Sequence, residues 1–242
     1  MKQAKDKTYG SDYVSKQKQN NMQQSSIIGV DIGTTSTKAV AFSLDGRVLY
    51  HQVKEYPIIS EEAGQAEQDP EQVLQAVLHT LAKVTEWLQE QGYTAEGVSF
   101  SSAMHSLILM DAAGKALTRC IIWADSRSHA CAEEIKSSAV GHKVYLQTGT
   151  PIHPMSPLPK LCWLRQAKPE LFNRAARFIG IKEYVLYRLF GKYKVDYSVA
   201  SAMGLFNLFE FEWHPDALEL ACITPEQLPE PVPPTYTFSG LS

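Results

Sequence analysis

The sequence has little of what marks several common classes of protein. Only four of its 242 residues are cysteines, and none of them forms a C-x-x-C pair: Cys120, Cys131, Cys162 and Cys222. A disulfide framework is therefore not expected, and buried thiols in a cytoplasmic protein are the default interpretation. The seven histidines lack the spacing of metal ligands, so they do not predict a metal centre.

Basic residues are not in excess either. Lys and Arg number 23 against 26 Asp and Glu, and the formal net charge of −3 gives no reason to expect a nucleic-acid partner. No apolar run approaches the ~18 residues that a membrane-spanning helix needs. The N-terminus also lacks the apolar segment of a secretory signal. We therefore expect neither a membrane nor a nucleic acid among the partners.

Residues 1–25 differ in composition from the rest of the chain. They hold five lysines against two aspartates, a net charge of +3, which leaves −6 for residues 26–242. They are rich in Lys, Gln, Asn and Ser and contain almost no aliphatic side chains. Such a segment cannot bury enough apolar surface to offset the entropy of ordering it. The composition predicts a disordered N-terminal extension, followed by one domain over residues 26–242.

A distinctive segment follows at residues 27–38, which read Ile-Ile-Gly-Val-Asp-Ile-Gly-Thr-Thr-Ser-Thr-Lys. Two apolar stretches flank Gly33, which predicts a β-hairpin with a polar turn. Backbone N–H groups, the hydroxyls of Thr34 and Thr35, and Lys38 would then face one point, as a phosphate requires. Asp31 is a hard oxygen ligand suited to Mg²⁺. An ordinary hairpin is the plainer alternative, and no Walker G-x-x-x-x-G-K-[ST] segment occurs.

The remaining pattern predicts a mixed α/β sheet with helices on its faces. Residues 47–56 continue the hairpin as a third antiparallel strand, and Asp69-Pro70 begins a helix that Gly92 ends. Further strands are predicted at residues 97–102, 107–111, 120–123 and 178–181, and further helices at 128–136, 158–166 and 182–190. The proline-rich residues 225–234 predict an extended connector.

Polar residues follow two of the predicted strands. Met104 and His105 come after the strand at 97–102, whose small side chains leave space near its end. His105 there can hydrogen-bond a polyol or satisfy a loop carbonyl. Trp123 ends the predicted strand at 120–123, and Asp125 and Arg127 follow it directly. Asp125 and Arg127 can pair with each other, which is the plainest interpretation, or reach a polar ligand.

Two further segments carry candidate side chains. Residues 148–160 contain four prolines, and this stiff path can position His153 or Lys160, or can form a rigid loop with no ligand. Asp196 and the hydroxyls after it are placed to cap a helix.

In this order, the segments Asp-x-Gly-Thr-Thr-Ser-Thr-Lys, Ser-Ser-Ala-Met-His-Ser, Trp-Ala-Asp-x-Arg and Asp-Tyr-Ser-x-Ala-Ser resemble the N-terminal domain of FGGY carbohydrate kinases. The stretch Thr-Gly-Thr-Pro-Ile-His-Pro-Met-Ser-Pro-Leu and residues 179–184 resemble the gluconokinase branch. The resemblance covers residues 26–242. It implies an α/β ribonuclease H-like domain of the actin, Hsp70 and sugar-kinase type, with a mixed central sheet flanked by helices.

The resemblance also implies roles for individual residues. Gly33, Thr34, Thr35 and Lys38 would face the phosphates of ATP, with Asp31 near Mg²⁺. The sugar pocket would be lined by Met104, His105, Trp123, Asp125 and Arg127, with His153 and Lys160 as further candidates for polyol or carboxylate contacts. Arg127 is the candidate for a bidentate grip on the carboxylate of gluconate.

One departure from the family pattern is important. FGGY kinases place their catalytic base, an aspartate, in a Gly-Ala-x-Asp-Gly segment, and this sequence contains no such segment. The base is therefore expected beyond Ser242, together with the second domain, and no residue here is assigned as catalytic. We expect an inactive N-terminal part of an ATP-dependent gluconokinase that forms 6-phosphogluconate when whole. The alternatives are a kinase for another sugar such as xylulose, or a non-catalytic sugar-binding or interaction domain. Homodimer formation is left open.

Overall fold

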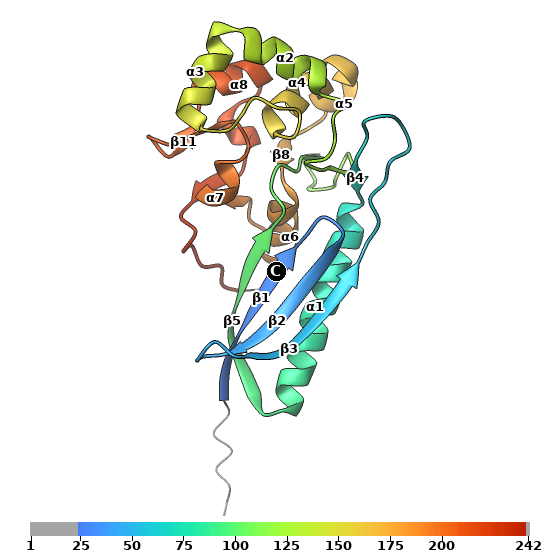
Figure 1. Cartoon of the computed structure of the whole chain (residues 1–242), viewed down its shortest axis with the longest axis vertical. Coiled ribbons are helices and arrows are strands. Elements are labelled where there is room, and N and C mark those ends of the chain that lie inside the picture. Colours follow the sequence, from blue (N-terminus) through green and yellow to red (C-terminus); the bar gives the residue numbers. More distant parts are fainter. Residues whose placement is uncertain (1–23, 241–242) are drawn as a thin grey trace, which may run out of the picture.

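Four strands form the main sheet in the order β3-β2-β1-β5 (Figure 1). The computed structural model describes residues 24–240, in which these strands span Gln24–Ile32 (β1), Ser36–Ser43 (β2), Val48–Glu55 (β3) and Tyr93–Ser102 (β5). β2 pairs antiparallel with both β1 and β3, whereas β1 and β5 run parallel. The sheet is thus mixed, as predicted.

Helix α1 (Pro70–Glu90) covers one face of this sheet. Alternate residues of β1, namely Ile28, Val30 and Ile32, are buried toward a core shared with α1. The backbone N–H of Glu71 donates to the Asp69 side chain at 2.9 Å, which caps the helix as its sequence predicts. Gly92 follows the helix with φ +77°, a left-handed conformation that favours glycine.

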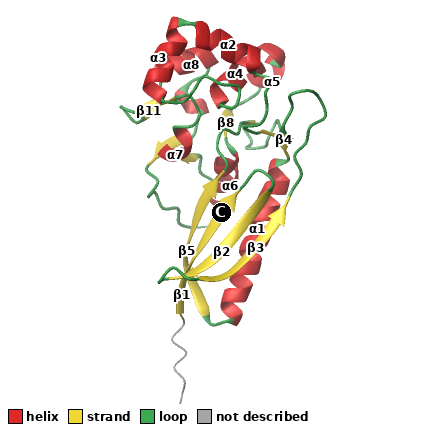
Figure 2. Cartoon of the chain, viewed as in Figure 1, coloured by secondary structure: helices red, strands yellow, loops and turns green. Residues whose placement is uncertain are grey.

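The second half of the chain forms a helical layer beyond the ends of the strands (Figure 2). Its helices are α2 (His129–Ser137), α3 (Ala139–Thr148), α4 (Pro157–Ala167), α5 (Pro169–Asn173), α6 (Ile181–Phe190), α7 (Tyr197–Ala200), α8 (Pro215–Ala221) and a 3₁₀ turn (Pro225–Gln227). The remaining strands are short. β4 (Glu67–Gln68) precedes α1, and β6 (Ile108–Met110) and β7 (Cys120–Ile121) precede α2. The others are β8 (Arg177–Ile179), β9 (Lys194–Asp196), β10 (Phe206–Asn207), β11 (Glu212–Trp213) and β12 (Glu230–Val232).

Most predicted elements are present, and the exceptions have local causes. Helix α3 escapes prediction because Gly141 weakens its helical pattern. A Cβ at Gly141 would lie 1.9 Å from the Ile135 carbonyl oxygen, so glycine is needed for the close approach of α2. Helices α5 and α8 are also missed, and both are short. The predicted connector at 225–234 is wrong in part, because it contains the 3₁₀ turn and β12, which pairs with β9.

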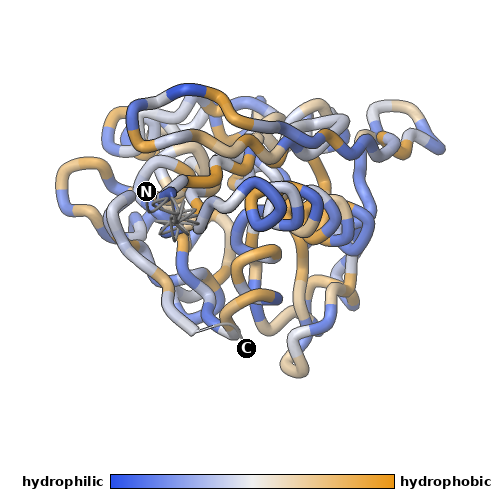
Figure 3. The backbone as a smooth tube through the Cα atoms, turned by 90° about the horizontal axis from the view of Figure 1, so that it is seen from below, coloured by the Kyte–Doolittle hydropathy of each residue, from blue (hydrophilic) through white to orange (hydrophobic). Residues whose placement is uncertain are grey.

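Most of the predicted N-terminal extension falls outside the residues that the structure describes. Residues 1–23 lie outside the described residues, while Gln24 and Ser25, which were assigned to the extension, already belong to β1. Within residues 24–240, no helix is long and apolar enough to cross a membrane. Viewed from the sheet end, hydrophilic and hydrophobic residues are interspersed along the backbone (Figure 3).

Candidate functional site

The two predicted halves of the site meet where β1 and β5 end. Because these strands are parallel, their carboxyl ends lie at the same edge of the sheet. The Ala103 N–H donates to the Ile32 carbonyl at 2.7 Å and joins the two strand ends. The turn after β1 is therefore adjacent to the segment that carries Met104 and His105. Ligands commonly bind at such an edge of an α/β sheet.

Gly33 closes the turn between β1 and β2. Its N–H donates to the Ser36 carbonyl at 2.9 Å. A Cβ at this position would lie 2.9 Å from the same oxygen, so a larger residue would force the turn open. The hairpin predicted from the sequence is confirmed, and its turn presents Thr34 and Thr35 at the edge of the sheet. We call residues 33–35 the β1–β2 turn below.

Three side chains from elsewhere in the chain hold the β1–β2 turn. The Tyr56 hydroxyl donates to the Gly33 carbonyl at 2.8 Å, and the Gln68 amide donates to the Thr34 carbonyl. The Trp123 indole N–H donates to the Thr34 hydroxyl at 3.0 Å. Sequence reasoning missed Tyr56 and Gln68, since neither belongs to a motif. These bonds fix the turn so that it needs little reorganisation to receive a ligand.

Trp123 connects the predicted phosphate side with the predicted sugar side. Its ring is 48% exposed although its indole N–H is bonded to Thr34. An exposed aromatic ring held by one hydrogen bond offers a flat apolar surface with a fixed orientation, which suits the C–H face of a sugar. Met104 is similarly exposed, at 43%.

Asp31 and Lys38 face each other across the first hairpin. They are register partners of β1 and β2, and both are exposed. Among residues 24–240 no hydrogen bond or ion pair engages the carboxylate of Asp31, and no cluster of three or more potential metal ligands occurs. Mg²⁺ in phosphate sites is usually held by one or two carboxylates together with phosphates and water. One exposed carboxylate beside the β1–β2 turn fits that pattern.

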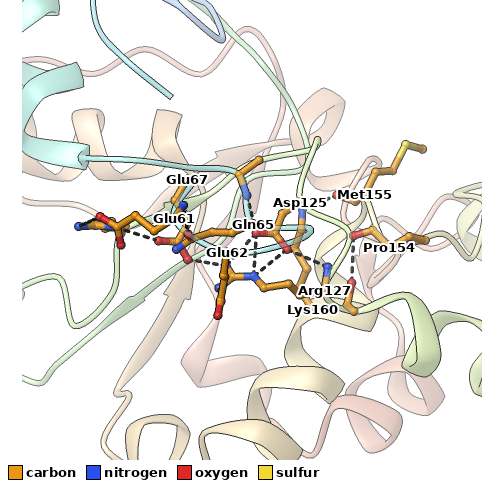
Figure 4. A network of polar contacts seen from close by, with 12 residues as sticks. Glu61, Glu62, Gln65, Glu67, Asp125, Arg127, Pro154, Met155 and Lys160 are labelled. Carbon is orange, nitrogen blue, oxygen red and sulfur yellow. Dashed lines mark hydrogen bonds and ion pairs between the residues drawn. The ribbon is translucent and has the colours of Figure 1, made fainter. Parts of the chain in front are cut away.

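Asp125 and Arg127 pair with each other, as the plainest interpretation has it (Figure 4). The Arg127 side chain is only 8% exposed and lies 2.8 Å from Asp125 and 2.8 Å from Glu62, and it also pairs with Glu67. Its guanidinium lies over the Trp163 ring at 4.6 Å. Burial opposes the charge of Arg127, but the hydrogen bonds that it donates to Asp125, Glu67 and Glu62 outweigh burial and raise its pKa.

This network limits what Arg127 can do for a ligand. All three of its guanidinium nitrogens already donate to carboxylates of the chain. Asp125 is fully buried and also accepts the Ala66 N–H at 2.9 Å. The pair therefore fastens the loop before β4 to the segment after β7. The predicted grip of Arg127 on a substrate carboxylate would have to compete with these bonds.

His105 and Lys160 lie together, with Lys160 completely buried. The Lys160 ammonium donates to the His105 carbonyl at 2.7 Å and to the Met155 carbonyl at 2.6 Å. His105 has φ +67°, and its Nδ1 lies 2.7 Å from the Ala202 carbonyl oxygen. Burial lowers the pKa of His105, and it lowers the pKa of Lys160 to about 7. His153 is exposed, and its Nδ1 accepts the Met155 N–H at 3.1 Å.

A small buried cavity lies beside His105. It is lined in part by Ser102, Ala103, Gly180 and Glu183. The Ser102 hydroxyl and one carboxyl oxygen of Glu183 are buried without a hydrogen-bond partner, whereas the other carboxyl oxygen of Glu183 accepts the Gly180 N–H at 2.7 Å. Burial raises the pKa of Glu183 to about 7.

The raised pKa of Glu183 makes folding stability depend on pH. The folded chain holds this proton up to about pH 7, whereas the unfolded carboxyl loses it near 4.5. Stability should therefore fall by about 3 kcal/mol as pH rises through this range. In Glu183→Gln that part of the decrease should vanish in urea unfolding measured from pH 4 to 8. Glu90→Gln, at the exposed end of α1, is the control and should keep the wild-type slope.

Comparison with known proteins decides the family. Residues 26–239 match the N-terminal domain of the FGGY family of carbohydrate kinases. The chain belongs to this family. The match spans the β1–β2 turn and every candidate site residue, and it confirms the resemblance drawn from the motifs.

Two curated relatives from Bacillus subtilis (strain 168) illustrate the range within this family. Over 216 residues the chain is 47% identical to a gluconokinase, covering 89% of the chain and 42% of that relative. It is 31% identical to a xylulose kinase, covering 78% of the chain and 38% of that relative. The chain thus spans about two fifths of the length of these relatives.

Solved structures confirm the ribonuclease H-like sugar-kinase fold. A gluconate kinase from Lactobacillus acidophilus superposes with a TM-score of 0.86 at 36% identity, covering 90% of this chain and 44% of that one. A ligand-bound xylulose kinase from the same organism superposes equally well, at 37% identity and the same coverage. The fold alone therefore does not distinguish these two sugar substrates.

Proposed function

We propose that this FGGY domain serves the ATP-dependent phosphorylation of D-gluconate to 6-phosphogluconate. The observation that carries the proposal is the contrast in identity between relatives. Gluconokinases reach 47% and 48%, whereas a xylulose kinase reaches 31%. The full activity, its substrates and its partners are part of this proposal, because the chain matches less than half of each relative.

The β1–β2 turn supplies the phosphate side of the proposed site. The Thr34 and Thr35 hydroxyls and the turn's backbone N–H groups donate hydrogen bonds to ATP phosphate oxygens, and Lys38 adds a positive charge. Asp31 would hold Mg²⁺, and the ion would supply positive charge that offsets the charge of the phosphates. The bonds from Tyr56 and Gln68 keep the turn in place, which supports positioning of the phosphates.

The segment after β5 supplies the sugar side. Met104 and Trp123 present exposed apolar surface, and His105 adds a ring nitrogen at the end of β5. Asp125 and Arg127 act here through the loop that they fasten. His153 is exposed near the same segment and can donate to a polyol or a carboxylate. In this proposal the polyol lies against Trp123 with one end toward the β1–β2 turn.

A second candidate substrate is xylulose. It is favoured by the ligand-bound xylulose kinase, which superposes with a TM-score of 0.86 and is 37% identical. That identity equals the value for the gluconate kinase within one percentage point. The third hypothesis is a non-catalytic sugar-binding domain. It predicts that sugar binds without turnover, both in this chain and in a chimaeric kinase.

A chimaeric kinase tests the proposal. Residues 26–239 of this chain would replace the matching part of the Bacillus subtilis gluconokinase, and ADP release would be followed with gluconate and with xylulose. We expect kcat/KM for gluconate to exceed that for xylulose at least roughly tenfold, the factor produced by about 1.4 kcal/mol. A preference for xylulose would establish the second candidate. Binding of sugar with no turnover on either substrate would favour the non-catalytic reading.

A further inference from the structure

Lys160 is completely buried, which is an unusual position for a cation. It lies in the first turn of α4, where the backbone N–H groups point outward and acidic side chains are the stabilising ones. No carboxylate of residues 24–240 forms an ion pair with it. Burying an ammonium group here without a carboxylate partner costs folding free energy. The hydrogen bonds of Lys160 therefore have to account for its presence.

The contacts of Lys160 join two loops at the sugar side of the site. Its ammonium donates to the His105 carbonyl, after β5, and to the Met155 carbonyl, before α4. Within residues 24–240, His105 is one of few non-glycine residues with positive φ, a left-handed conformation that is strained for a residue with a Cβ. The histidine ring is fixed from a third segment by the Ala202 carbonyl. The backbone and the ring of His105 are thus held separately.

We propose that Lys160 is a positioning residue, which holds His105 in its left-handed conformation so that the ring and the neighbouring Met104 face the sugar. Lys160 does not touch the substrate. This inference rests on the proposed function only for the identity of the ligand. It differs from the prediction in which Lys160 itself contacts a polyol or a carboxylate, because an ammonium buried against two carbonyls has no surface to offer.

The test uses the 242-residue chain with ¹³C,¹⁵N-labelled histidine. Lys160→Met keeps the length of the side chain but removes both hydrogen bonds. The titratable groups that act on Lys160 are Asp125, Cys120 and Arg127, and those that act on His105 are Lys160 and His153. Without Lys160 the desolvated His105 loses a neighbouring cation, so its pKa should rise toward that of an ordinary histidine. His51, on β3, is the internal reference and should not change.

Two further variants separate positioning from a general loss of stability. Leu161→Ala removes a fully buried core contact next in sequence and should lower the unfolding midpoint while leaving the His105 signals unchanged. Lys160→Gln removes the charge but retains an N–H donor, so the pKa of His105 should rise as in Lys160→Met, while the chemical shifts of the His105 ring should change less. If Leu161→Ala moves His105 as far as Lys160→Met does, the inference is wrong.

Gluconate titration of the same samples gives the second readout. Lys160→Met should weaken gluconate binding roughly tenfold, but should add almost nothing once His105 is replaced by alanine, because residues that act as one unit are not additive. Equal losses with and without His105 would mean that Lys160 contacts the ligand directly and would overturn the inference. If the wild-type chain binds no gluconate, the proposed function fails, and the His105 titration alone decides the role of Lys160.

Discussion

A polypeptide of residues 1–242 is expected to release no ADP above background when it is given gluconate, ATP and Mg²⁺. The sequence contains no Gly-Ala-x-Asp-Gly segment, in which FGGY kinases carry their base. Loss of general-base catalysis typically lowers the rate by roughly 10²–10⁴-fold. The rate should fall further if ATP is positioned only by the contacts that this domain provides. The chimaeric kinase, assayed in parallel, provides the positive control.

Activity of the 242-residue chain by itself would contradict this expectation. Turnover by the 242-residue chain within tenfold of the chimaera would place the base among the residues of this chain. Asp31 would then be the first to replace, since it is the exposed carboxylate beside the β1–β2 turn. Sugar binding should survive in either case, so binding measured on the same preparation separates an incomplete site from a misfolded one.

Asp125→Ala is expected to destabilise the chain by about 3–5 kcal/mol, the typical cost of breaking a buried ion pair by removing one partner. Asp125 is completely buried and accepts hydrogen bonds from Arg127 and from the Ala66 N–H. Its loss leaves the guanidinium with Glu62 and Glu67 and leaves a buried N–H without an acceptor. Urea unfolding followed by circular dichroism measures the change.

The sequence offers a matched control for this variant. Asp45 and Arg47 have the same spacing as Asp125 and Arg127, and they pair at 2.9 Å, but their side chains are 61% and 77% exposed. Exposed pairs contribute between zero and about 1 kcal/mol. Asp45→Ala should therefore leave the urea midpoint almost unchanged. Equal losses in the two variants would show that burial does not strengthen the Asp125 contacts, and that the loop before β4 is held by other groups.

Local patterns predict the sheet edge and the hairpin well. Alternating apolar residues and Gly33 define β1 and β2, and Asp69-Pro70 and Gly92 bound α1, because each signal acts on its own neighbours in the chain. The same holds for Asp196, whose side chain accepts the Val199 N–H and begins α7 as predicted. These features require no knowledge of the tertiary structure.

The partners of the site residues depend on the tertiary structure and could not be predicted. Arg127 reaches Glu62 and Glu67, some 60 residues away, in addition to the neighbour that the sequence indicated. Lys160 follows four prolines at the start of a helix, yet it is completely buried. Tyr56 and Gln68 hold the β1–β2 turn without belonging to any motif. Long-range packing decides all of these contacts.

The location of the sugar site can be tested through the four tryptophans of the chain. Each contributes one indole N–H resonance: Trp87 is stacked between tyrosines, Trp163 lies under Arg127, and Trp213 donates to Pro229. Gluconate should shift the indole N–H of Trp123 in a saturable way and leave the other three in place. A shift of the Trp163 resonance with Trp123 unchanged would place the sugar on the far side of Arg127, and would contradict a sugar site at Trp123.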